Sequence, residues 1–449
     1  MTTTILPDLL SEVRTFRTQH PQVTHVDLIC MDLPGHFYGK RYPIDMLEKV
    51  AAGAKLKLPQ NCILLGTQGG LYPIGDYCFR DGDPDAARRP IPGSLKLVPW
   101  EPQPLAQMLI SSENTDTPIE FEPRVVLARV LERLARRGLR PVVAFELEFY
   151  LFAPRFRAGL PQYPRAVDGH RRDDQPNMHI ERLSHFSSVL AAMVSAANEQ
   201  GIDANVISAE LGPGQFEINF GHSDDALQAA DWAALFRRST QGVARQHGYR
   251  ASFMSKPYLQ APGSGMHVHV SLYDHDGRNV LAANQQQALR HAVAGCLELL
   301  PHCMPIFAAN HNAFRRYGSM VNSASQASWG FEDRDASIRI PESDPHNLRI
   351  EHRLAGADAN PYLVLAAILT GLEHGLDNGR EPITPLNQDR SSGIDFPKDM
   401  LSAVTAMRDH PQLAGSLGSE FVMVYCENKR QEYLDFMNEI SPREYHWYA

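Results

Sequence analysis

Hydrophobic and polar positions follow two different periods along this chain. In six stretches apolar side chains recur at three- and four-residue spacing, which is typical of helices with one buried face. These stretches predict helices over residues 123–138, 181–201, 225–246, 286–300, 361–377 and 428–438. Roughly the first 110 residues differ, because they hold short strand-like runs (25–31, 96–99 and 105–111) between loops rich in glycine and proline. We expect a boundary near residues 113–121, between domains 1–112 and 113–449.

Four later stretches alternate between polar and apolar residues, as half-buried strands do. They cover residues 144–152, 215–220, 266–272 and 348–354. Side chains two apart on a strand face the same side, about 6.6 Å apart, so each stretch presents one polar face. The polar faces carry mainly Glu, His and Arg and no Lys: Glu146, Glu148, Gln215, Glu217, Asn219, His267, His269, Ser271, Arg349, Glu351 and Arg353. Any one of these faces could belong to a solvated sheet, but the four together favour a lined cavity.

The residue types on these faces point to one kind of chemistry. Clustered carboxylates repel one another and are costly to desolvate, so they need compensating cations. Carboxylates with an imidazole suit Mg²⁺ or Mn²⁺ better than Zn²⁺. Arginines suit phosphate or carboxylate groups, which the guanidinium fork binds through two hydrogen bonds. The sequence therefore predicts a site for divalent metals, phosphate and a carboxylate substrate, with phosphoryl transfer as the hypothesis. The chain holds no Walker A motif and no kinase glycine-rich loop, which argues against both classes.

Composition narrows the class of protein further. The 449 residues include 43 Lys and Arg against 52 Asp and Glu, a net charge of −9, which argues against nucleic-acid binding. The six cysteines form no Cys-x-x-Cys pair and are typical of a reducing compartment. The N-terminus has no signal-peptide pattern. The apolar stretch from Tyr362 meets Glu373 before the roughly 20 apolar residues that a membrane span needs. We expect a cytoplasmic protein that binds no nucleic acid and no membrane.

Seven motifs in order make the chain resemble class I of the glutamine synthetase family over nearly its whole length. They lie at residues 145–149, 210–217, 256–257, 263–269, 336–341, 349–353 and 359–362, with further likeness at 32–40 and 441–448. The resemblance implies an α+β fold: a small N-terminal β-grasp domain, and a large catalytic domain whose curved antiparallel sheet forms an open barrel flanked by helices. It also implies a homo-oligomer of hexameric rings, usually paired into a dodecamer, with active sites shared between neighbouring subunits.

The resemblance assigns a role to each candidate site residue. It implies two to three Mg²⁺ or Mn²⁺ ions, with one site formed by Glu148, Glu210 and Glu217 and a second by Glu146, His267 and Glu351. His269 and Ser271 match nucleotide contacts, and Arg339 and Arg349 match phosphate contacts of ATP. Arg334 matches the arginine that stabilises the transferring phosphoryl group. Arg316 and Arg353 match the pair that holds glutamate, with Gly263 on the loop beside them. Each residue taken alone could instead be an ordinary strand residue or half of a surface ion pair.

The implied chemistry has two steps, and the sequence departs from the family in the second. Glutamate attacks the γ-phosphate of ATP to give γ-glutamyl phosphate, and an amine then displaces phosphate. The acidic groups that usually receive ammonium are missing, because Asn322 stands where the loop glutamate is expected and residues 58–65 contain no acid. The tyrosine expected near residues 175–179 is also missing; Pro176, Asn177 and Met178 stand there. This pattern resembles the γ-glutamylamine ligases of the family.

The favoured function is therefore ATP-dependent ligation of glutamate to a primary organic amine, as a first step of amine catabolism. The acceptor could be a polyamine, an alkyl monoamine or an aromatic amine. The absence of these acids slightly favours a monoamine, although Asp32, Asp76 and Glu332 could lie near the acceptor. Asp32 is a candidate acceptor-side residue from a neighbouring subunit, or simply a turn-forming residue before Pro34. Two alternatives stay open: a glutamine synthetase that uses ammonium, and a non-catalytic family member that acts in assembly or regulation.

Overall fold

Two β-sheets organise the chain. The computed structural model describes residues 8–77, 81–166, 177–318 and 323–449. The first sheet has the order β2-β1-β6-β4-β3, with β5 paired to β6. Its central strands β1 and β6 run parallel, which fits a β-grasp-like arrangement, while β2 pairs with β1 in the antiparallel sense. The strands are β1 (His25–Met31), β2 (Phe37–Pro43), β3 (Leu56–Pro59), β4 (Asp85–Pro90), β5 (Lys96–Leu97) and β6 (Leu105–Ser111).

Both faces of this first sheet are covered, which explains why β1 is apolar almost throughout. Val26 and Leu28 pack with α1 (Leu9–Gln19) and α2 (Ile44–Ala51) in a small core. Ile29 and Met31, on the other face, join the main core of the protein. Since neighbouring strand residues point to opposite faces, one strand serves both cores.

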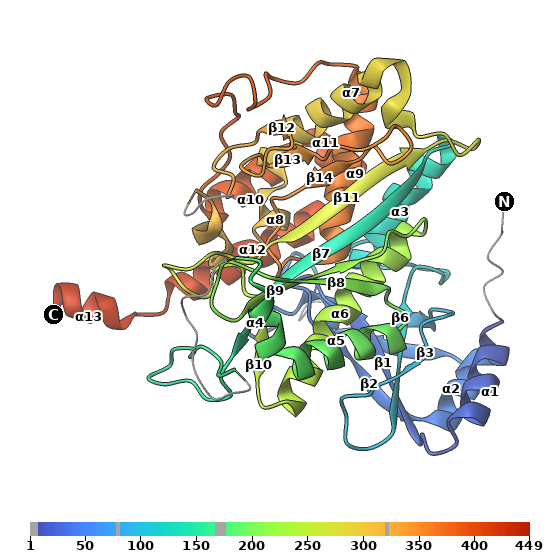
Figure 1. The fold of residues 1–449 in the computed structure, drawn as a ribbon. Helices are drawn as coiled ribbons and strands as arrows, with labels where there is room; N and C mark the ends of the chain where they lie inside the picture. The colour runs from blue at the N-terminus through green and yellow to red at the C-terminus, as the bar shows by residue number, and fades with distance from the viewer. Residues whose placement is uncertain (1–7, 78–80, 167–176, 319–322) are drawn as a thin grey trace.

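The second sheet is larger, curved and mostly antiparallel. Its order is β12-β13-β14-β11-β7-β9-β8, with β10 paired to β7. The long strands β7 and β11 cross its middle side by side (Figure 1). The strands are β7 (Arg140–Phe152), β8 (Ala204–Ala209), β9 (Gln215–Phe220), β10 (Arg250–Ser252), β11 (Met266–Tyr273), β12 (Trp329–Phe331), β13 (Ile338–Ile340) and β14 (Ile350–His352). The expected α+β architecture with a curved antiparallel sheet is confirmed.

One face of the large sheet packs in the main core. Phe145, Leu147 and Phe149 of β7 are at most 1% exposed, and the Phe149 ring meets Phe236 of α6 with centroids 6.4 Å apart. The alternation along β7 therefore leaves its glutamates on the opposite face.

The large sheet is accompanied by helices. They are α3 (Pro123–Arg136), α4 (Ile180–His185), α5 (Ser187–Glu199), α6 (Ala226–Gln246), α7 (Ala283–Leu299), α8 (Met304–Phe307), α9 (Pro361–Asn378), α10 (Met400–Arg408), α11 (Pro411–Leu417), α12 (Ser419–Met437) and α13 (Pro442–Tyr448).

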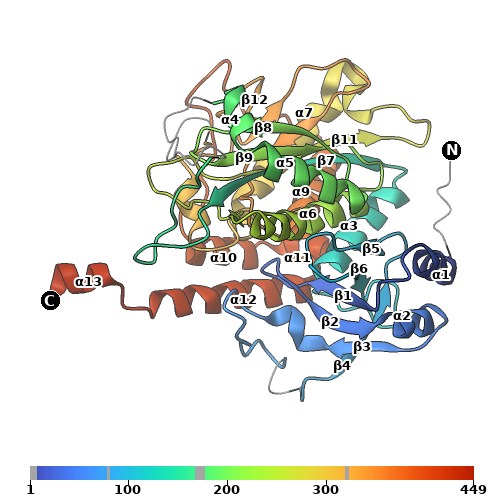
Figure 2. The ribbon, with the colours of Figure 1, turned by 60° about the horizontal axis from the view of Figure 1, so that its bottom comes forward.

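The two sheets are joined through the C-terminal half of the chain. Figure 2 shows the first sheet next to α12 and α13 extending away from the body. The Nδ2 atom of Asn428 in α12 donates to the backbone oxygen of Leu64 at 2.9 Å. Asn360, which caps α9, donates through Nδ2 to the backbone oxygen of Asp32 at 2.9 Å. The contact thus combines the apolar packing of β1 in the main core with buried polar side chains that satisfy loop carbonyl groups.

Several elements differ from the prediction. The helix expected over 181–201 is two helices, because the backbone leaves the helical region at Phe186, where φ is −120°. Helix α12 begins at Ser419, well before the expected residue 428, because its first half is apolar on more than one side and shows no single buried stripe. The strand expected over 96–99 contains only Lys96 and Leu97, and the strand expected over 348–354 shortens to Ile350–His352.

The described residues bear on the expected absence of a membrane span and on the state of the cysteines. Within these residues, the helices lack a stretch that is both long and apolar enough to cross a lipid bilayer. Five cysteines are free thiols and Cys78 lies outside the described residues; the five are Cys30, Cys62, Cys296, Cys303 and Cys426. The division at residue 112 stays a prediction.

Candidate active site

Strand pairing aligns the polar residues at the centre of the large sheet. Glu146 on β7 lies opposite His267 on β11 and Asn219 on β9. Two residues further along β7, Glu148 lies opposite Glu217 on β9. Because residues two apart on a strand point to the same side, these five side chains share one face of the sheet. The predicted polar face is therefore confirmed at its centre.

The polar row continues across the neighbouring strands. His269 on β11 lies opposite Glu351 on β14, which in turn lies opposite Arg339 on β13. The Nη1 atom of Arg339 is 2.7 Å from Oε2 of Glu351, and Arg353 donates to the other carboxylate oxygen of Glu351. Glu351 is only 1% exposed, so these two guanidinium groups offset the cost of burying its charge.

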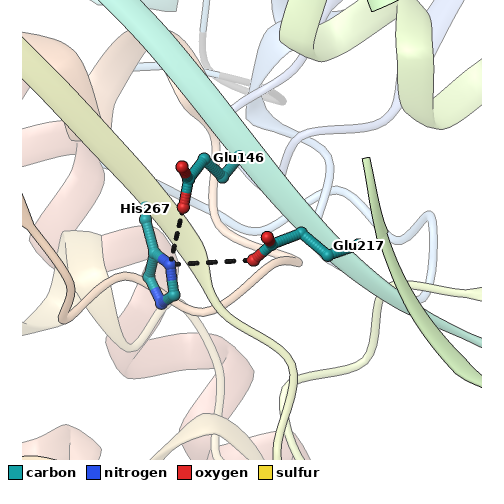
Figure 3. Close-up of side chains that lie close together, drawn as sticks. All are labelled: Glu146, Glu217 and His267. Carbon is teal, nitrogen blue, oxygen red and sulfur yellow. Dashed lines mark hydrogen bonds and ion pairs between the residues drawn. The ribbon is translucent and has the colours of Figure 1, made fainter. Parts of the chain in front are cut away.

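Two histidines connect the carboxylates. Figure 3 shows Glu146, Glu217 and His267 pointing toward one another. The Nδ1 atom of His267 is 3.3 Å from Oε2 of Glu146 and 3.9 Å from Oε2 of Glu217, while its Nε2 is 3.7 Å from Oε1 of Glu148. The Nε2 atom of His269 is 3.0 Å from Oε1 of Glu146. The imidazoles thus bring side chains from three strands into one cluster.

Burial and repulsion raise the pKa of two of these carboxyl groups. Burial, together with the charges of Glu146, Glu148 and Glu210, raises the pKa of Glu217 to about 9. Burial and the charge of Glu148 raise the pKa of Glu210 to about 7, although the charge of Arg334 opposes this change. Arg334 itself is exposed on the turn between β12 and β13. This part of the cluster therefore carries more negative charge than its own side chains can balance.

The other two carboxylates have the opposite shift. Burial alone would raise the pKa of Glu146, but hydrogen bonds with His267 and His269 outweigh it and the net pKa is lowered. Burial would also raise the pKa of Glu351, but the charges of Arg353, His269 and His267 lower it. These two groups therefore stay ionised and are ready to bind a cation.

The chemistry of the cluster fits a divalent metal. Two sets of three ligand atoms lie within 4.8 Å of one another: those of Glu146, Glu217 and His267, and those of Glu146, His269 and Glu351. Carboxylate oxygens with one imidazole are the donor set expected for Mg²⁺ or Mn²⁺. Glu146 belongs to both sets, and His269, expected at the nucleotide, is part of the second. The expected grouping, with Glu148, Glu210 and Glu217 at one ion and Glu146, His267 and Glu351 at another, stays a prediction.

Glu148 and Glu210, the other expected metal ligands, are held by hydrogen bonds to residues at the strand ends. The Oε2 atom of Glu148 accepts from the backbone N–H of Gly265 at 2.9 Å and from Nε2 of Gln215 at 3.2 Å. The backbone N–H of Glu210 donates to the oxygen of Gln215 at 3.0 Å, and its carbonyl oxygen accepts from Arg182. The side chain of Glu148 and the backbone of Glu210 are thus held in place.

The residues expected to hold glutamate also lie together. The Nη1 atom of Arg316 donates to the backbone oxygen of Leu354 at 2.8 Å, and its Nη2 donates to that of Arg353 at 3.2 Å. Gly263 packs directly on Arg316: a Cβ atom there would lie 2.8 Å from Cγ of Arg316 and 2.5 Å from the backbone oxygen of Ser255. The close approach requires glycine, so the three residues form one compact group beside Glu351.

The residues expected to contact ATP are split between two environments. The Nε atom of Arg349 donates to Nδ1 of His269 at 3.2 Å, so these two lie together. Arg339 reaches Glu332 through Nη2 at 2.8 Å as well as Glu351. Glu332, considered above as an acceptor-side acid, therefore serves to hold this arginine. The hydroxyl of Ser271 donates to the backbone oxygen of Leu348 at 2.9 Å and is 7% exposed.

The acceptor-side candidates fall in three parts of the chain. Asn322 and Pro176 lie outside the described residues. The backbone N–H of Met178 donates to the oxygen of Ala209 at 2.9 Å, directly before Glu210. Asp32 is 2% exposed, and its Oδ1 accepts from the N–H groups of Gly35 and His36, at 2.8 and 2.7 Å. Within the single chain Asp32 therefore has the turn-forming role.

Comparison with known proteins points to one family. The glutamine synthetase catalytic domain matches residues 120–448. The chain is 37% identical over 448 residues to the gamma-glutamylputrescine synthetase PuuA of Escherichia coli K12, covering 97% of this chain and 94% of the relative. It is 29% identical over 386 residues to the glutamate–isopropylamine ligase of a Pseudomonas species, covering 84% and 82% of the two chains.

A solved structure agrees with the fold. The structure described as GmaS without ligand superposes with a TM-score of 0.83 at 25% identity and covers 97% of this chain and 98% of its own. The match to the catalytic domain spans more than half of the chain and includes each of the expected site residues from Glu146 to Arg353. The chain therefore belongs to the glutamine synthetase family.

Proposed function

We propose that the protein ligates glutamate to a primary organic amine, converting ATP to ADP and phosphate and producing a γ-glutamylamide. The observation that carries the proposal is the combination of an intact carboxylate–histidine–arginine cluster with two relatives, named for putrescine and isopropylamine ligation, that match most of the chain. The relatives differ in the amine that they are named for, so they support a class of acceptor and not one compound.

In the first step, this chain's residues position glutamate against ATP. Arg316 and Arg353 bind the glutamate carboxylates, and Gly263 keeps the loop beside them close to Arg316. The γ-carboxylate oxygen attacks the γ-phosphorus and ADP leaves. Arg339 and Arg334 neutralise negative charge on the phosphoryl group while it is transferred.

Divalent cations fit the carboxylate–histidine cluster described above. We propose two to three Mg²⁺ or Mn²⁺ ions, with one site formed by Glu148, Glu210 and Glu217 and a second by Glu146, His267 and Glu351. When bound, such ions supply Lewis-acid neutralisation of phosphate oxygens.

In the second step, the amine nitrogen attacks the acyl carbon of γ-glutamyl phosphate. The C–O bond to phosphate breaks as the C–N bond of the amide forms, and the proton that the nitrogen loses is taken up by the departing phosphate. The amine must be neutral to attack. Residues 58–65 contain no acid, so they lack the negative charge that would attract ammonium. This absence supports an organic amine as the acceptor. A polyamine, an alkyl monoamine and an aromatic amine all belong to the proposed class.

We further propose that the protein acts in the cytoplasm as a homo-oligomer of hexameric rings, paired into a dodecamer, with active sites shared between subunits. Apolar and aromatic side chains at the C-terminus support a contact between copies. Tyr445, Trp447 and Tyr448 of α13 are 63%, 63% and 81% exposed. Aromatic residues so exposed on one projecting helix are typical of an interaction surface.

The test measures phosphate release from ATP with glutamate and Mg²⁺ or Mn²⁺, comparing ammonium with polyamines, alkyl monoamines and aromatic amines at equal concentration. Mass spectrometry identifies the γ-glutamyl product. We expect turnover with one class of amine and little with ammonium, and none with a Glu217→Gln control. Ammonium turnover at least as efficient as that with any amine would contradict the proposal in favour of a glutamine synthetase. Absence of turnover with all acceptors would favour a non-catalytic role.

A further inference from the structure

Three segments meet behind the residues proposed to hold glutamate. They are residues 255–264, which include Gly263, residues 310–316, which include Arg316, and residues 355–358, which directly follow Arg353 and Leu354. The position of all three therefore determines the shape of the proposed glutamate site. The inference below rests on the proposed function, because it concerns glutamate binding.

One carboxylate links the three segments. The Oδ1 atom of Asp358 accepts from the Ser255 hydroxyl at 2.6 Å. Its Oδ2 atom accepts from the Ser255 backbone N–H at 3.0 Å and from Nδ2 of Asn310 at 2.9 Å. Both oxygens are thus committed to neighbouring loops, and Asp358 lies outside the polar row of the sheet.

Two asparagines extend this connection. The Oδ1 atom of Asn310 accepts from the backbone N–H of Ala313, the first residue of the turn that contains Arg316. The Oδ1 atom of Asn312 accepts from the backbone N–H of Lys256 at 2.8 Å, and its Nδ2 donates to the backbone oxygen of Lys256 at 2.9 Å. The turn and the loop are therefore held to each other as well as to Asp358.

Backbone contacts carry the connection to the site. The backbone oxygen of Ser255 accepts from the N–H of Ser264 at 2.9 Å, and the oxygen of Ser264 accepts from the N–H of Ala357 at 3.0 Å. The same oxygen of Ser255 lies against Gly263, which packs on Arg316. A displacement of Ser255 would therefore move Gly263 relative to Arg316.

We propose that Asp358 is a positioning residue for glutamate binding. It does not touch the substrate; its carboxylate fixes Ser255 and Asn310, and through them the loop of Gly263 and the turn of Arg316. Hydrogen bonds to an ionised group are stronger than those between neutral groups, so an aspartate holds these loops more firmly than a neutral side chain would.

The main test is Asp358→Ala, assayed in the full-length protein with the best amine acceptor. We expect the KM for glutamate to rise about tenfold or more, since hydrogen bonds to a charged partner are lost, while the KM for ATP changes less than about twofold. Asp358→Asn should recover most of the loss. Its amide oxygen can accept from the N–H of Ser255 and from Asn310, and its amide nitrogen can donate to the Ser255 hydroxyl.

Two further variants separate positioning from folding. Asp231→Ala removes another buried aspartate, which binds Arg124 and the hydroxyl of Tyr362 away from this network. It should lower Tm without changing the KM for glutamate. Asn312→Ala removes only the two hydrogen bonds to Lys256, so it should fold even where Asp358→Ala does not, and raise the KM for glutamate about threefold or more.

Calorimetric titration with L-glutamate separates this inference from the proposed reaction. Glutamate affinity that falls about tenfold in Asp358→Ala and recovers in Asp358→Asn supports the inference even where no amine is turned over, in which case the proposed reaction alone fails. An unchanged KM and affinity for glutamate in folded Asp358→Ala and Asn312→Ala overturns the inference and leaves the proposed function standing. An equal rise in the KM for ATP also overturns it. A wild-type protein that does not bind glutamate overturns both.

Discussion

Glu146 and Glu217 face the same imidazole from neighbouring strands, yet their pKa values are shifted in opposite directions. His267 Nδ1 is 3.3 Å from Glu146 and 3.9 Å from Glu217. Glu146 also contacts His269, and the hydrogen bonds outweigh its burial and lower its pKa. Glu217 gains burial and the repulsion of the other carboxylates, which raise its pKa to about 9. The cluster thus combines an ionised carboxylate, Glu146, with a protonated one, Glu217. A bound cation would change the protonation of this pair.

The first prediction concerns the stability of the metal-free protein. The folded pKa of Glu217, about 9, lies above its ordinary value of 4.5, so folding favours the protonated form. As pH rises from 4.5 to 9 the unfolded chain loses this proton and the folded protein keeps it, so the free energy of unfolding falls. Glu217→Gln removes the ionisable group. In EDTA it should raise Tm at pH 8 by about 2–4 °C relative to wild type, and less at pH 5.

Thermal melts across pH measure this difference. Glu132→Gln is the matched control, because Glu132 is exposed and pairs only loosely with Arg136, at 3.8 Å. It should leave Tm nearly unchanged at every pH. A Glu217→Gln protein that is less stable than wild type at pH 8 would mean that the carboxylate is already compensated without metal.

The second prediction concerns metal binding. Mn²⁺ should raise the Tm of the wild-type protein, since a ligand that binds the folded state stabilises it in proportion to log concentration above Kd. His267→Asn removes an imidazole that lies within reach of three carboxylates, and should require about tenfold more Mn²⁺ for the same shift. His275→Asn is the control, because the His275 side chain is 79% exposed. Equal Mn²⁺ dependence of the two variants would place the metal elsewhere.

The sequence predicted the central strands well because their alternation is strict. Strand β9 has the expected bounds, and the buried positions of β7 alternate with its glutamates. Alternation fixes which face of its own strand a side chain occupies, so the shared face of Glu146 and Glu148 on β7, and that of Glu217 and Asn219 on β9, followed directly. The short strands β12 and β13 were missed, since three residues are too few to show a period.

The grouping of residues across strands depends on register, which a single sequence does not contain. The structure pairs Glu351 with His269 and with Arg339. His269 therefore lies near the carboxylates of Glu146 and Glu351, a grouping that the sequence did not predict. The role of Asp358 was likewise invisible, because it depends on contacts among segments about 50 and 100 residues apart in the chain.

The third prediction tests the close approach at Gly263. In Gly263→Ala the new methyl group would lie 2.5 Å from the backbone oxygen of Ser255 and 2.8 Å from Cγ of Arg316, so one of them must move. We expect the KM for glutamate to rise about tenfold, with a smaller change in the KM for ATP. Gly415→Ala is the control, because a Cβ atom there meets nothing within 4 Å and the residue lies in α11. Gly263→Ala kinetics equal to those of Gly415→Ala would separate this glycine from the glutamate site.

The last prediction concerns Arg334, which is exposed but close enough to lower the pKa of Glu210. If it neutralises the phosphoryl group only during transfer, Arg334→Ala should reduce kcat about 100-fold and change the KM values for ATP and glutamate less than about threefold. Tm should stay close to wild type, because an exposed side chain contributes little packing. Arg278→Ala, at a side chain that is 77% exposed, is the control and should change neither parameter. A higher KM for ATP with unchanged kcat would instead assign Arg334 to ground-state binding, since only a group whose contacts strengthen in the transition state changes kcat alone.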